Sequence, residues 1–243
     1  MEYIRGIGGS GVRSRDIIVW LPPGYFTNKK EYYPVLYMHD GQNIFDPATC
    51  GFGYDWQVDE RADSLIRYNI INPVIIVGMY NTPARRIEYS PNDSGEAYMR
   101  YVVNVVKPLI DKTYRTKPER EFTAVAGSSM GGLISFMMGW QYDSVFSKAG
   151  CFSAALQIYQ FNYVPFVNKT KERKNTFFYI DNGGLGLEQK LQTGIDAMLV
   201  ALRTKGYSEG KDFVFIKDET AEHNEIAWSK RIGKVLEMFY GRK

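Results

Sequence analysis

The stretch Gly127-Ser128-Ser129-Met130-Gly131 matches the Gly-x-Ser-x-Gly pattern of a nucleophile elbow. Residues 121–126 before it form a short apolar run typical of a buried strand, and residues 133–138 after it form the apolar side of a helix. A strand that turns directly into a helix strains the residue at the corner, and small residues two positions to either side let the two segments approach. The glycines at both ends of the motif occupy those positions. The sequence therefore predicts that Ser129 projects its hydroxyl beyond the end of the strand.

A bare Gly-x-Ser-x-Gly pattern also occurs by chance in turns rich in glycine and serine, so its context has to decide. The strand before the motif and the helix after it favour the elbow. In that arrangement the N–H of Met130 lies in the first turn of the helix and points at a developing oxyanion. The hypothesis then requires a base and an acid in the correct chain order.

Composition limits the possible classes of protein. The chain has 243 residues, of which 44% are hydrophobic and 23% charged, as in an ordinary globular domain, so disordered and fibrous classes are excluded. Its 30 basic and 27 acidic residues are interspersed, and Glu172 interrupts the densest basic cluster, residues 169–174. We interpret that cluster as a solvated loop and expect no nucleic-acid partner.

No pattern in the sequence indicates a cofactor or a metal. Cys50 and Cys151 are not spaced as a metal or redox pair, and Cys151 lies in an apolar run, as a buried small side chain does. There is no glycine-rich phosphate loop and no nucleotide fingerprint. The first six residues lack the apolar region of a signal peptide, and no stretch has the length of a transmembrane helix. We expect no membrane association, take the cytoplasm as a default only, and leave the oligomeric state open.

Apolar, β-branched stretches alternate with stretches of helical periodicity along the chain. Strands are predicted over residues 15–21, 33–39, 73–79, 121–126, 147–153, 176–180 and 212–216, and helices over 56–67, 95–114, 188–205 and 225–240. The first two strands are close in sequence with a turn between them, so we expect them to form an antiparallel pair. Pro108 lies inside the second helix and is expected to kink it. The alternation predicts one α/β domain over residues 1–243, with a mostly parallel central sheet and helices on both faces.

Two irregular segments, residues 44–56 and 156–175, are expected to line a pocket beyond the carboxyl ends of the strands, where such sheets bind ligands. The second segment contains Tyr159, Phe161, Tyr163 and Phe166. These aromatic side chains either form a lid or substrate-binding wall or pack down over the sheet.

A serine hydroxyl needs a base to remove its proton, and the chain offers two histidines. His39 precedes the elbow and ends the second strand, whereas His223 follows the last strand. The chain order of an α/β-hydrolase is serine, then acid, then histidine. The order therefore selects His223 as the base, and we expect His39 to shape the loop that follows it.

The acid should lie on the loop after residue 180, where the sequence Asp181-Asn182-Gly183-Gly184-Leu185-Gly186-Leu187-Glu188 contains two carboxylates. Asp181 would lie at the strand tip and Glu188 at the start of the following helix. Either could hold one tautomer of the imidazole and stabilise the imidazolium. The second oxyanion donor is expected from the loop after the second strand, where Gln42 is named by position because a backbone N–H needs no particular side chain.

Several further stretches resemble the esterase family of the α/β-hydrolase superfamily, which includes feruloyl and acetyl-xylan esterases, enterochelin esterases, S-formylglutathione hydrolase and mycolyltransferases. The resemblance covers nearly the whole chain and is far more specific than the elbow. It rests on Leu21-Pro-Pro-Gly-Tyr25, Val35-Leu-Tyr-Met-His-Asp-Gly-Gln-Asn43, Arg86-Ile-Glu-Tyr-Ser-Pro91, Ala126-Gly-Ser-Ser-Met-Gly-Gly-Leu133 and Glu222-His-Asn-Glu-Ile-Ala-Trp228.

The resemblance implies that Ser129 is the nucleophile and His223 the base. Similar family members place the triad acid a few residues beyond the strand end, which favours Glu188 over Asp181. It also implies an esterase acting on a small-molecule or carbohydrate ester and leaves the acyl group and the alcohol open.

Three functions are compatible with these residues. The first is a serine carboxylesterase that works through an acyl-enzyme on Ser129. The second is an acyltransferase that uses the same triad and passes the acyl group to an alcohol, since only the exclusion of water separates the two reactions. The third is a non-catalytic carbohydrate-binding protein on the same fold, for which the 15% aromatic content is the support and the intact triad the counter-argument.

Overall fold

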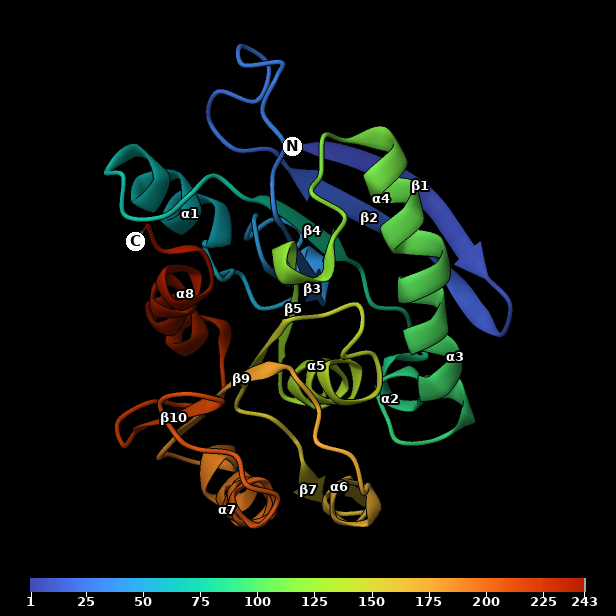
Figure 1. Ribbon diagram of the computed structural model, residues 1–243, viewed down its shortest axis with the longest axis vertical. Coiled ribbons are helices and arrows are strands. Elements are labelled where there is room, and N and C mark those ends of the chain that lie inside the picture. Colours follow the sequence, from blue (N-terminus) through green and yellow to red (C-terminus); the bar gives the residue numbers. More distant parts are fainter. Residues whose placement is uncertain (243) are drawn as a thin grey trace.

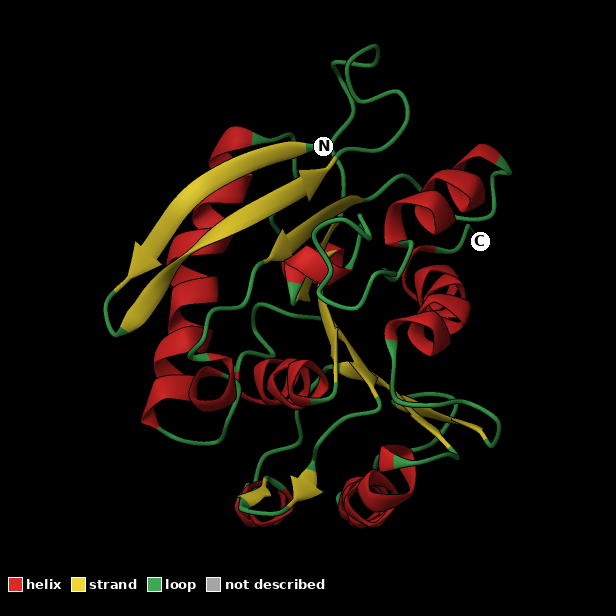
Figure 2. Ribbon diagram, turned by 180° about the vertical axis from the view of Figure 1, so that it is seen from behind, coloured by secondary structure: helices red, strands yellow, loops and turns green. Residues whose placement is uncertain are grey.

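The computed structural model describes residues 1–242, which form a central eight-stranded sheet with helices on both faces (Figures 1 and 2). Its strands lie in the order β1-β2-β4-β3-β5-β6-β9-β10. The two strands at one edge, β1 and β2, run antiparallel, and all neighbours from β4 to β10 run parallel. Their bounds are β1 Glu2–Gly9, β2 Val12–Trp20, β3 Val35–His39, β4 Ile75–Met79, β5 Thr123–Ser128, β6 Lys148–Phe152, β9 Phe177–Gly183 and β10 Phe213–Asp218. The predicted α/β fold with a mostly parallel sheet is confirmed.

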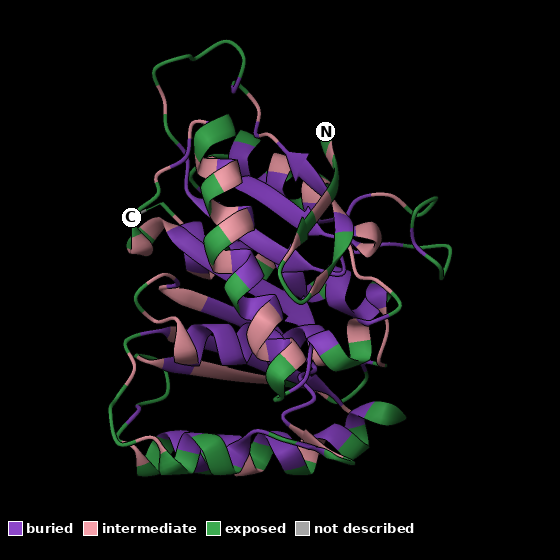
Figure 3. Cartoon of the chain, turned by 90° about the vertical axis from the view of Figure 1, so that its right-hand side faces the viewer, coloured by how far each residue is buried: buried purple, intermediate pink, exposed green. Residues whose placement is uncertain are grey.

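Successive side chains of each central strand point to opposite faces of the sheet and pack in two separate hydrophobic cores. On β3, Val35 and Tyr37 pack in one hydrophobic cluster, whereas Leu36 and Met38 pack in the other. Helices α1 and α8 cover the second cluster, and α3, α4, α5 and α7 cover the first (Figure 1). The central strands β3, β4 and β5 are accordingly buried on both faces, whereas the edge strand β1 and the outer sides of α1 and α7 are exposed (Figure 3). The helices span α1 Val58–Arg67, α2 Arg85–Glu88, α3 Asp93–Tyr101, α4 Lys107–Thr113, α5 Met130–Gln141, α6 Val164–Lys169, α7 Leu187–Thr204 and α8 Glu225–Tyr240. Within residues 1–242, no helix has both the length and the apolar content needed to cross a membrane.

The expected antiparallel pair of the first two predicted strands is wrong. The strands β2 and β3 are not neighbours, because β4 lies between them and pairs antiparallel with β2 and parallel with β3. The connection over residues 21–34 is long enough to pass across this edge of the sheet, so closeness in sequence does not force a hairpin. All five residues of β3 are buried, which favours a position between two parallel neighbours.

The edge strand β1 has no counterpart among the predicted strands. Its sequence, Glu2–Gly9, contains three glycines and exposes most of its side chains, so it lacks the apolar, β-branched signal of a strand. The strand β1 pairs with β2 through a register that shifts twice, which is typical of a bulged edge strand.

The helix predicted over residues 95–114 is continuous but changes from α-helix to π-helix and back. Five residues, Val102–Val106, form a π-helical turn between α3 and α4, immediately before Pro108. Proline has no N–H for the carbonyl four residues earlier and its ring crowds that carbonyl. The wider π turn relieves this conflict, so the predicted disruption occurs as a change of helix type.

The aromatic residues of segment 156–175 divide between the core and the surface. Phe161 and Tyr163 are buried in the core, whereas Tyr159 and Phe166 are exposed. The segment itself forms a small hairpin, β7 Gln157–Ile158 with β8 Phe161–Asn162, followed by α6. It is thus partly a packed element rather than a continuous aromatic wall.

His39 is buried at the carboxyl end of β3, where its Nδ1 lies 2.8 Å from the hydroxyl of Tyr98 and its ring packs against Tyr89. Burial lowers the pKa of His39 to about 3; the nearby Asp40 opposes this shift and Arg15 adds to it. The imidazole is therefore a neutral structural group beneath the loop after β3, consistent with the role expected from its position.

We expect the free energy of unfolding to decrease as the pH falls below 6.5, because the unfolded chain protonates His39 there and the folded chain does so only near pH 3. This one residue contributes a slope of at most about 1.4 kcal/mol per pH unit. The variant His39→Gln lacks the titrating group and should have a shallower slope. Urea unfolding of both proteins at several pH values between 7 and 4 measures the difference, and parallel slopes would contradict the assignment.

Candidate active site

The predicted elbow is present where β5 ends at Ser128 and α5 begins at Met130. Ser129 lies between them and has φ 58° and ψ −118°, a backbone conformation that residues other than glycine rarely adopt. A Cβ at Gly127 would lie only 2.8 Å from the backbone carbonyl carbon of Gly131. The two glycines therefore allow the strand and the helix to approach as the motif requires.

Backbone hydrogen bonds hold the corner in place. The N–H of Ser129 donates to the carbonyl of Phe152 at 2.9 Å, and the carbonyl of Ser129 accepts from Ala155 at 3.0 Å and from Leu133 at 3.0 Å. The strained residue is thus tied to the end of β6 as well as to its own helix. Such support is what allows a strained backbone conformation to persist.

Ser129 and His223 lie at the same cavity, which has a volume of about 690 Å³. The loop after β3 contributes Gln42, and α8 contributes Trp228, whose ring packs edge-on against the imidazole at 5.0 Å. The expected contribution of residues 44–56 is found, because Thr49, Gly51, Phe52, Tyr54 and Trp56 line the cavity. Segment 156–175 contributes no side chain to this cavity within the described chain, so that expectation is wrong. Its strand β7 and its helix α6 pack against α7 instead.

The acid loop and the histidine loop are joined to each other. The N–H groups of Gly184 and Leu185 both donate to the carbonyl of Ala221, two residues before His223, at 3.1 Å. A Cβ at Gly183 would lie 2.4 Å from that same carbonyl oxygen. The glycine-rich sequence is therefore what lets the backbone of one loop lie against the other.

Of the two candidate acids, Glu188 is the one beside His223. Glu188 Oε1 lies 3.4 Å from His223 Nδ1, which is within ion-pair distance but lacks the geometry of a hydrogen bond. Catalytic hydrogen bonds are often long in structures without substrate and tighten in the complex. The carboxylate is fully buried and also accepts a 2.6 Å hydrogen bond from the hydroxyl of Ser153. Burial favours the neutral acid, but the contacts with His223 and Ser153 outweigh it and hold the pKa of Glu188 below its usual value.

Asp181 lies near the end of β9, whereas Glu188 lies at the start of α7, and Asp181 has other partners. It accepts hydrogen bonds from the N–H of Ser153 and the hydroxyl of Tyr179, both at 2.8 Å, and its Oδ2 lies 3.1 Å from Arg231 Nε. Burial raises its pKa to about 6, although the positive charge of Arg231 opposes the shift. Asp181 thus belongs to a structural cluster behind Glu188.

The two expected oxyanion donors come from different loops. Gln42 lies in the short turn Gly41–Asn43 after β3, and its side-chain oxygen accepts from the N–H of Asn81 at 3.1 Å. Met130 is the first residue of α5, where a backbone N–H has no acceptor in its own helix. Gln42 lines the cavity, and Met130 directly follows Ser129 at the start of α5.

Two further pairs brace the loop after β3, and sequence analysis did not find them. Arg85 makes two hydrogen bonds to Asp40, of 2.7 and 2.8 Å, and lines the cavity. On the other side, Asn43 Nδ2 donates to Glu225 Oε1 at 3.1 Å, which connects this loop to the first turn of α8. These residues are isolated polar positions far apart in the sequence, so no local pattern indicates their pairing.

One group of carboxylates within the described chain has atoms close enough for a metal ion, namely Asp55, Asp59 and Glu60 at the start of α1. Burial and a hydrogen bond with Glu60 raise the pKa of Asp59. The negative charge of Glu60 thus disfavours ionisation of Asp59.

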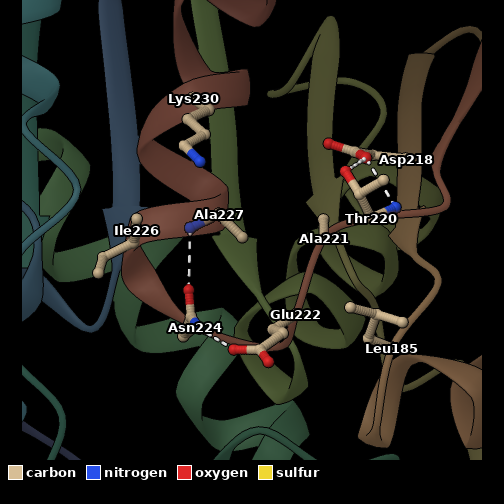
Figure 4. Close-up of a pocket in the computed structure, with 9 residues that line it drawn as sticks. All are labelled: Leu185, Asp218, Thr220, Ala221, Glu222, Asn224, Ile226, Ala227 and Lys230. Atoms are coloured by element: carbon tan, nitrogen blue, oxygen red, sulfur yellow. Dashed lines mark hydrogen bonds between the residues drawn. The ribbon is translucent and has the colours of Figure 1, made fainter.

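A second, smaller depression of about 240 Å³ lies beside the histidine loop (Figure 4). It is formed by the chain from β10 into α8, where Asn224 caps the helix by accepting from the N–H of Ala227 at 2.9 Å. Ser129 and His223 do not line it, so the larger cavity is the candidate active site.

Comparison with known proteins agrees with this fold. The model of the family described as "Putative esterase" matches residues 10–230. The chain belongs to this esterase family. The family resemblance expected from the sequence motifs is thereby confirmed.

The relatives of this esterase family member described below have low sequence identity to it. It is 26% identical over 231 residues to an endo-1,4-beta-xylanase/feruloyl esterase of Xylanibacter ruminicola, and the match covers 91% of this chain but 29% of that protein. Among solved structures, a ferulic acid esterase superposes with a TM-score of 0.81 at 21% identity, covering 98% and 97% of the two chains. The enterobactin esterase of Shigella flexneri superposes with a TM-score of 0.79 at 16% identity, covering 98% of this chain and 58% of that one. At these identities the superpositions establish the shared fold.

Substituting Gly127→Ala should disrupt the elbow, because the added Cβ meets backbone atoms that can move only if the strand and helix separate. We expect a loss of about 1–3 kcal/mol in unfolding free energy and a loss of at least roughly tenfold in ester turnover, since small misplacements of reacting groups are costly. Chemical denaturation and hydrolysis of p-nitrophenyl acetate measure the two effects.

Gly233→Ala is the matched control. Gly233 lies inside α8, and its added Cβ would be 3.4 Å from the flexible side chain of Arg61, so we expect unchanged turnover and a stability gain of up to about 1 kcal/mol. Equal effects of the two substitutions would contradict this account of the elbow.

Proposed function

We propose that this esterase family member is a serine carboxylesterase, with Ser129 as nucleophile, His223 as base and Glu188 as the acid that orients the base. The whole chain would then serve as one catalytic domain. The observation that carries the proposal is that the buried Glu188 carboxylate lies 3.4 Å from His223 Nδ1. His223 lines the same cavity as Ser129, which lies on the strained elbow. The order serine, acid, histidine along the chain agrees with it.

In the acylation step, Ser129 Oγ attacks the carbonyl carbon of the ester and its proton passes to His223 Nε2. The negative charge that develops on the carbonyl oxygen is stabilised by the N–H groups of Gln42 and Met130. Collapse of this intermediate breaks the bond to the alcohol oxygen, which takes the proton from His223. Water then attacks the acyl-enzyme by the same route and releases the acid and free Ser129.

Glu188 has a defined part in this cycle. Its negative charge stabilises the imidazolium that forms during each proton transfer and keeps the Nδ1 proton directed towards the carboxylate. The lowered pKa of Glu188 keeps it ionised at neutral pH. Asp181 takes no direct part, because its oxygens are occupied by Ser153, Tyr179 and Arg231.

The lining of the cavity is compatible with carbohydrate or aryl esters. Phe52 and Tyr54 are partly exposed on the loop over the cavity, and Trp56 and Trp228 lie deeper. Aromatic surfaces of this kind stack on sugar rings and on aromatic acyl groups. An acetyl or feruloyl ester of a carbohydrate, or a siderophore ester, is the substrate class that we propose. The relatives' names, xylanase/feruloyl esterase and enterobactin esterase, point the same way.

Acyl transfer to an alcohol other than water uses the same residues, and a binding protein without turnover would keep the cavity but not need the triad. Product analysis in the presence of added sugar alcohols separates transfer from hydrolysis. Glycan binding by Ser129→Ala, combined with an absence of hydrolysis by the parent, would favour the binding protein.

The direct test is hydrolysis of p-nitrophenyl acetate, methyl ferulate, acetylated xylan and a catecholate siderophore ester by the parent and by Ser129→Ala. We expect the parent to cleave at least one of them, and Ser129→Ala to lose about three orders of magnitude or more in kcat. A fluorophosphonate should label the parent once per chain and leave the variant unlabelled. Turnover or labelling that survives in Ser129→Ala would refute the assignment of the nucleophile.

Glu188→Gln should lower kcat by about a hundredfold to ten-thousandfold, because a neutral amide neither stabilises the imidazolium nor selects the correct tautomer. The control is Glu237→Gln on the exposed side of α8, for which we expect parental kinetics. Steady-state kinetics on the best ester of the panel compare the two, and a Glu188→Gln enzyme with parental kcat would exclude Glu188 as the acid.

A further inference from the structure

Ser153 lies just beyond the end of β6, completely buried and with φ 42°. Its hydroxyl meets side chains from two helices that lie far apart in the sequence. It donates to Glu188 on α7 at 2.6 Å, and it accepts from Trp228 Nε1 at 3.0 Å and from Arg231 Nη2 at 3.1 Å, both on α8. None of the motifs that carry the esterase resemblance includes this residue.

The chemistry of these partners determines where the hydroxyl proton points. A serine hydroxyl has one proton to donate and two lone pairs that accept. The indole of Trp228 and the guanidinium of Arg231 are donors only, so together they occupy both lone pairs of Ser153. The single O–H of Ser153 is then left for the carboxylate of Glu188. This direction follows from the partners and does not depend on a choice of hydrogen placement.

The bond from Ser153 reaches the oxygen that faces the base. Glu188 Oε1 accepts the hydrogen bond from Ser153, and the same atom lies 3.4 Å from His223 Nδ1. The other oxygen, Oε2, makes no hydrogen bond within residues 1–242. The position of the carboxylate relative to the imidazole therefore depends on Ser153.

A buried ion pair holds Ser153 itself in place. Asp181 Oδ1 accepts from the Ser153 N–H at 2.8 Å, and Asp181 Oδ2 lies 3.1 Å from Arg231 Nε. The pair thus contacts both the backbone and the hydroxyl of Ser153, because Asp181 accepts from the N–H and Arg231 donates to the hydroxyl. Such support is what a residue with a positive φ requires.

We propose that Ser153, locked by Arg231 and Asp181, is a positioning residue that directs the Glu188 carboxylate at His223. The inference rests on the proposed function, because it assigns Ser153 to the same triad. Ser153 is not among the residues that line the substrate cavity. Its hydroxyl is connected to His223 through the Glu188 carboxylate and through the indole of Trp228, which packs against the imidazole, and only the connection through Glu188 changes the charge that faces Nδ1.

The test compares Ser153→Ala and Ser153→Gly with the parent in kcat, KM and the pH dependence of kcat/KM on p-nitrophenyl acetate. Both variants lack the hydroxyl, and glycine accepts a positive φ without strain, so Ser153→Gly remains folded even where the alanine variant does not. Thr176→Val is the matched control, because Thr176 is also buried and its hydroxyl lies within hydrogen-bond distance of two carbonyl oxygens, 2.7 Å from Gly139 and 2.9 Å from Phe146, at the opposite end of β9.

We expect both Ser153 variants to lose about tenfold to a hundredfold in kcat, the range for a hydrogen bond to a charged group, with KM within about twofold. The acid limb of kcat/KM, which belongs to the Glu188–His223 pair, should move to higher pH. A carboxylate without its donor is more basic and holds a proton at the pair more tightly. The other charged groups near this pair are Asp181, Arg231 and Glu225, and they are the same in all three proteins.

Thr176→Val should lower stability and leave kcat and the acid limb unchanged. The positioning role would be overturned if the folded Ser153 variants kept the parental kcat and the parental acid limb, or if they changed no more than Thr176→Val does. The proposed esterase activity would remain intact in that case. A parent that hydrolyses no ester and resists the fluorophosphonate would overturn the proposed function and the inference together.

Discussion

The site depends on one backbone constraint, the left-handed turn at Ser129. Its φ of 58° is tolerated because Gly127 and Gly131 let β5 and α5 approach within contact of their backbones, and because Phe152 and Ala155 bind both peptide groups of the serine. The close approach of the two backbones and these hydrogen bonds offset the conformational strain at Ser129. The proposed nucleophile, Ser129, and the proposed oxyanion donor, Met130, both lie at this turn, which is hydrogen-bonded to the end of β6.

Around this corner the structure separates three buried carboxylates by giving each its own partners. Asp40 is paired with Arg85, Asp181 with Arg231, and Glu188 with His223 and Ser153. Burial dominates at Asp181 and raises its pKa to about 6, whereas hydrogen bonds and the imidazole dominate at Glu188 and lower its pKa. Two carboxylates that are close in sequence, one at the end of β9 and one at the start of α7, thus acquire different pKa values from their surroundings, as acid–base sites generally require.

The agreement between sequence and fold follows the strength of the local signal. Helix α8 spans Glu225–Tyr240, as its periodicity predicts, and the buried strands were found because continuous apolar runs with turn residues between them leave few alternatives. The strand β1 was missed because its glycines and exposed side chains resemble a loop. The pairing of β2 with β3 was wrong because strand neighbours are chosen by long-range packing, which a turn between two segments does not reveal.

By itself the sequence determined the nucleophile elbow, the chain order of serine and histidine, and the family, because these depend on residues adjacent in the chain. The residues alone left Asp181 and Glu188 open, and the family pattern only favoured Glu188. Tertiary structure placed Glu188 beside His223, and it brought Arg85 to Asp40 and Ser153 to Glu188. These contacts join side chains from separate strands and helices whose meeting at the carboxyl edge of the sheet is decided by strand order and register, which no local pattern of residues encodes.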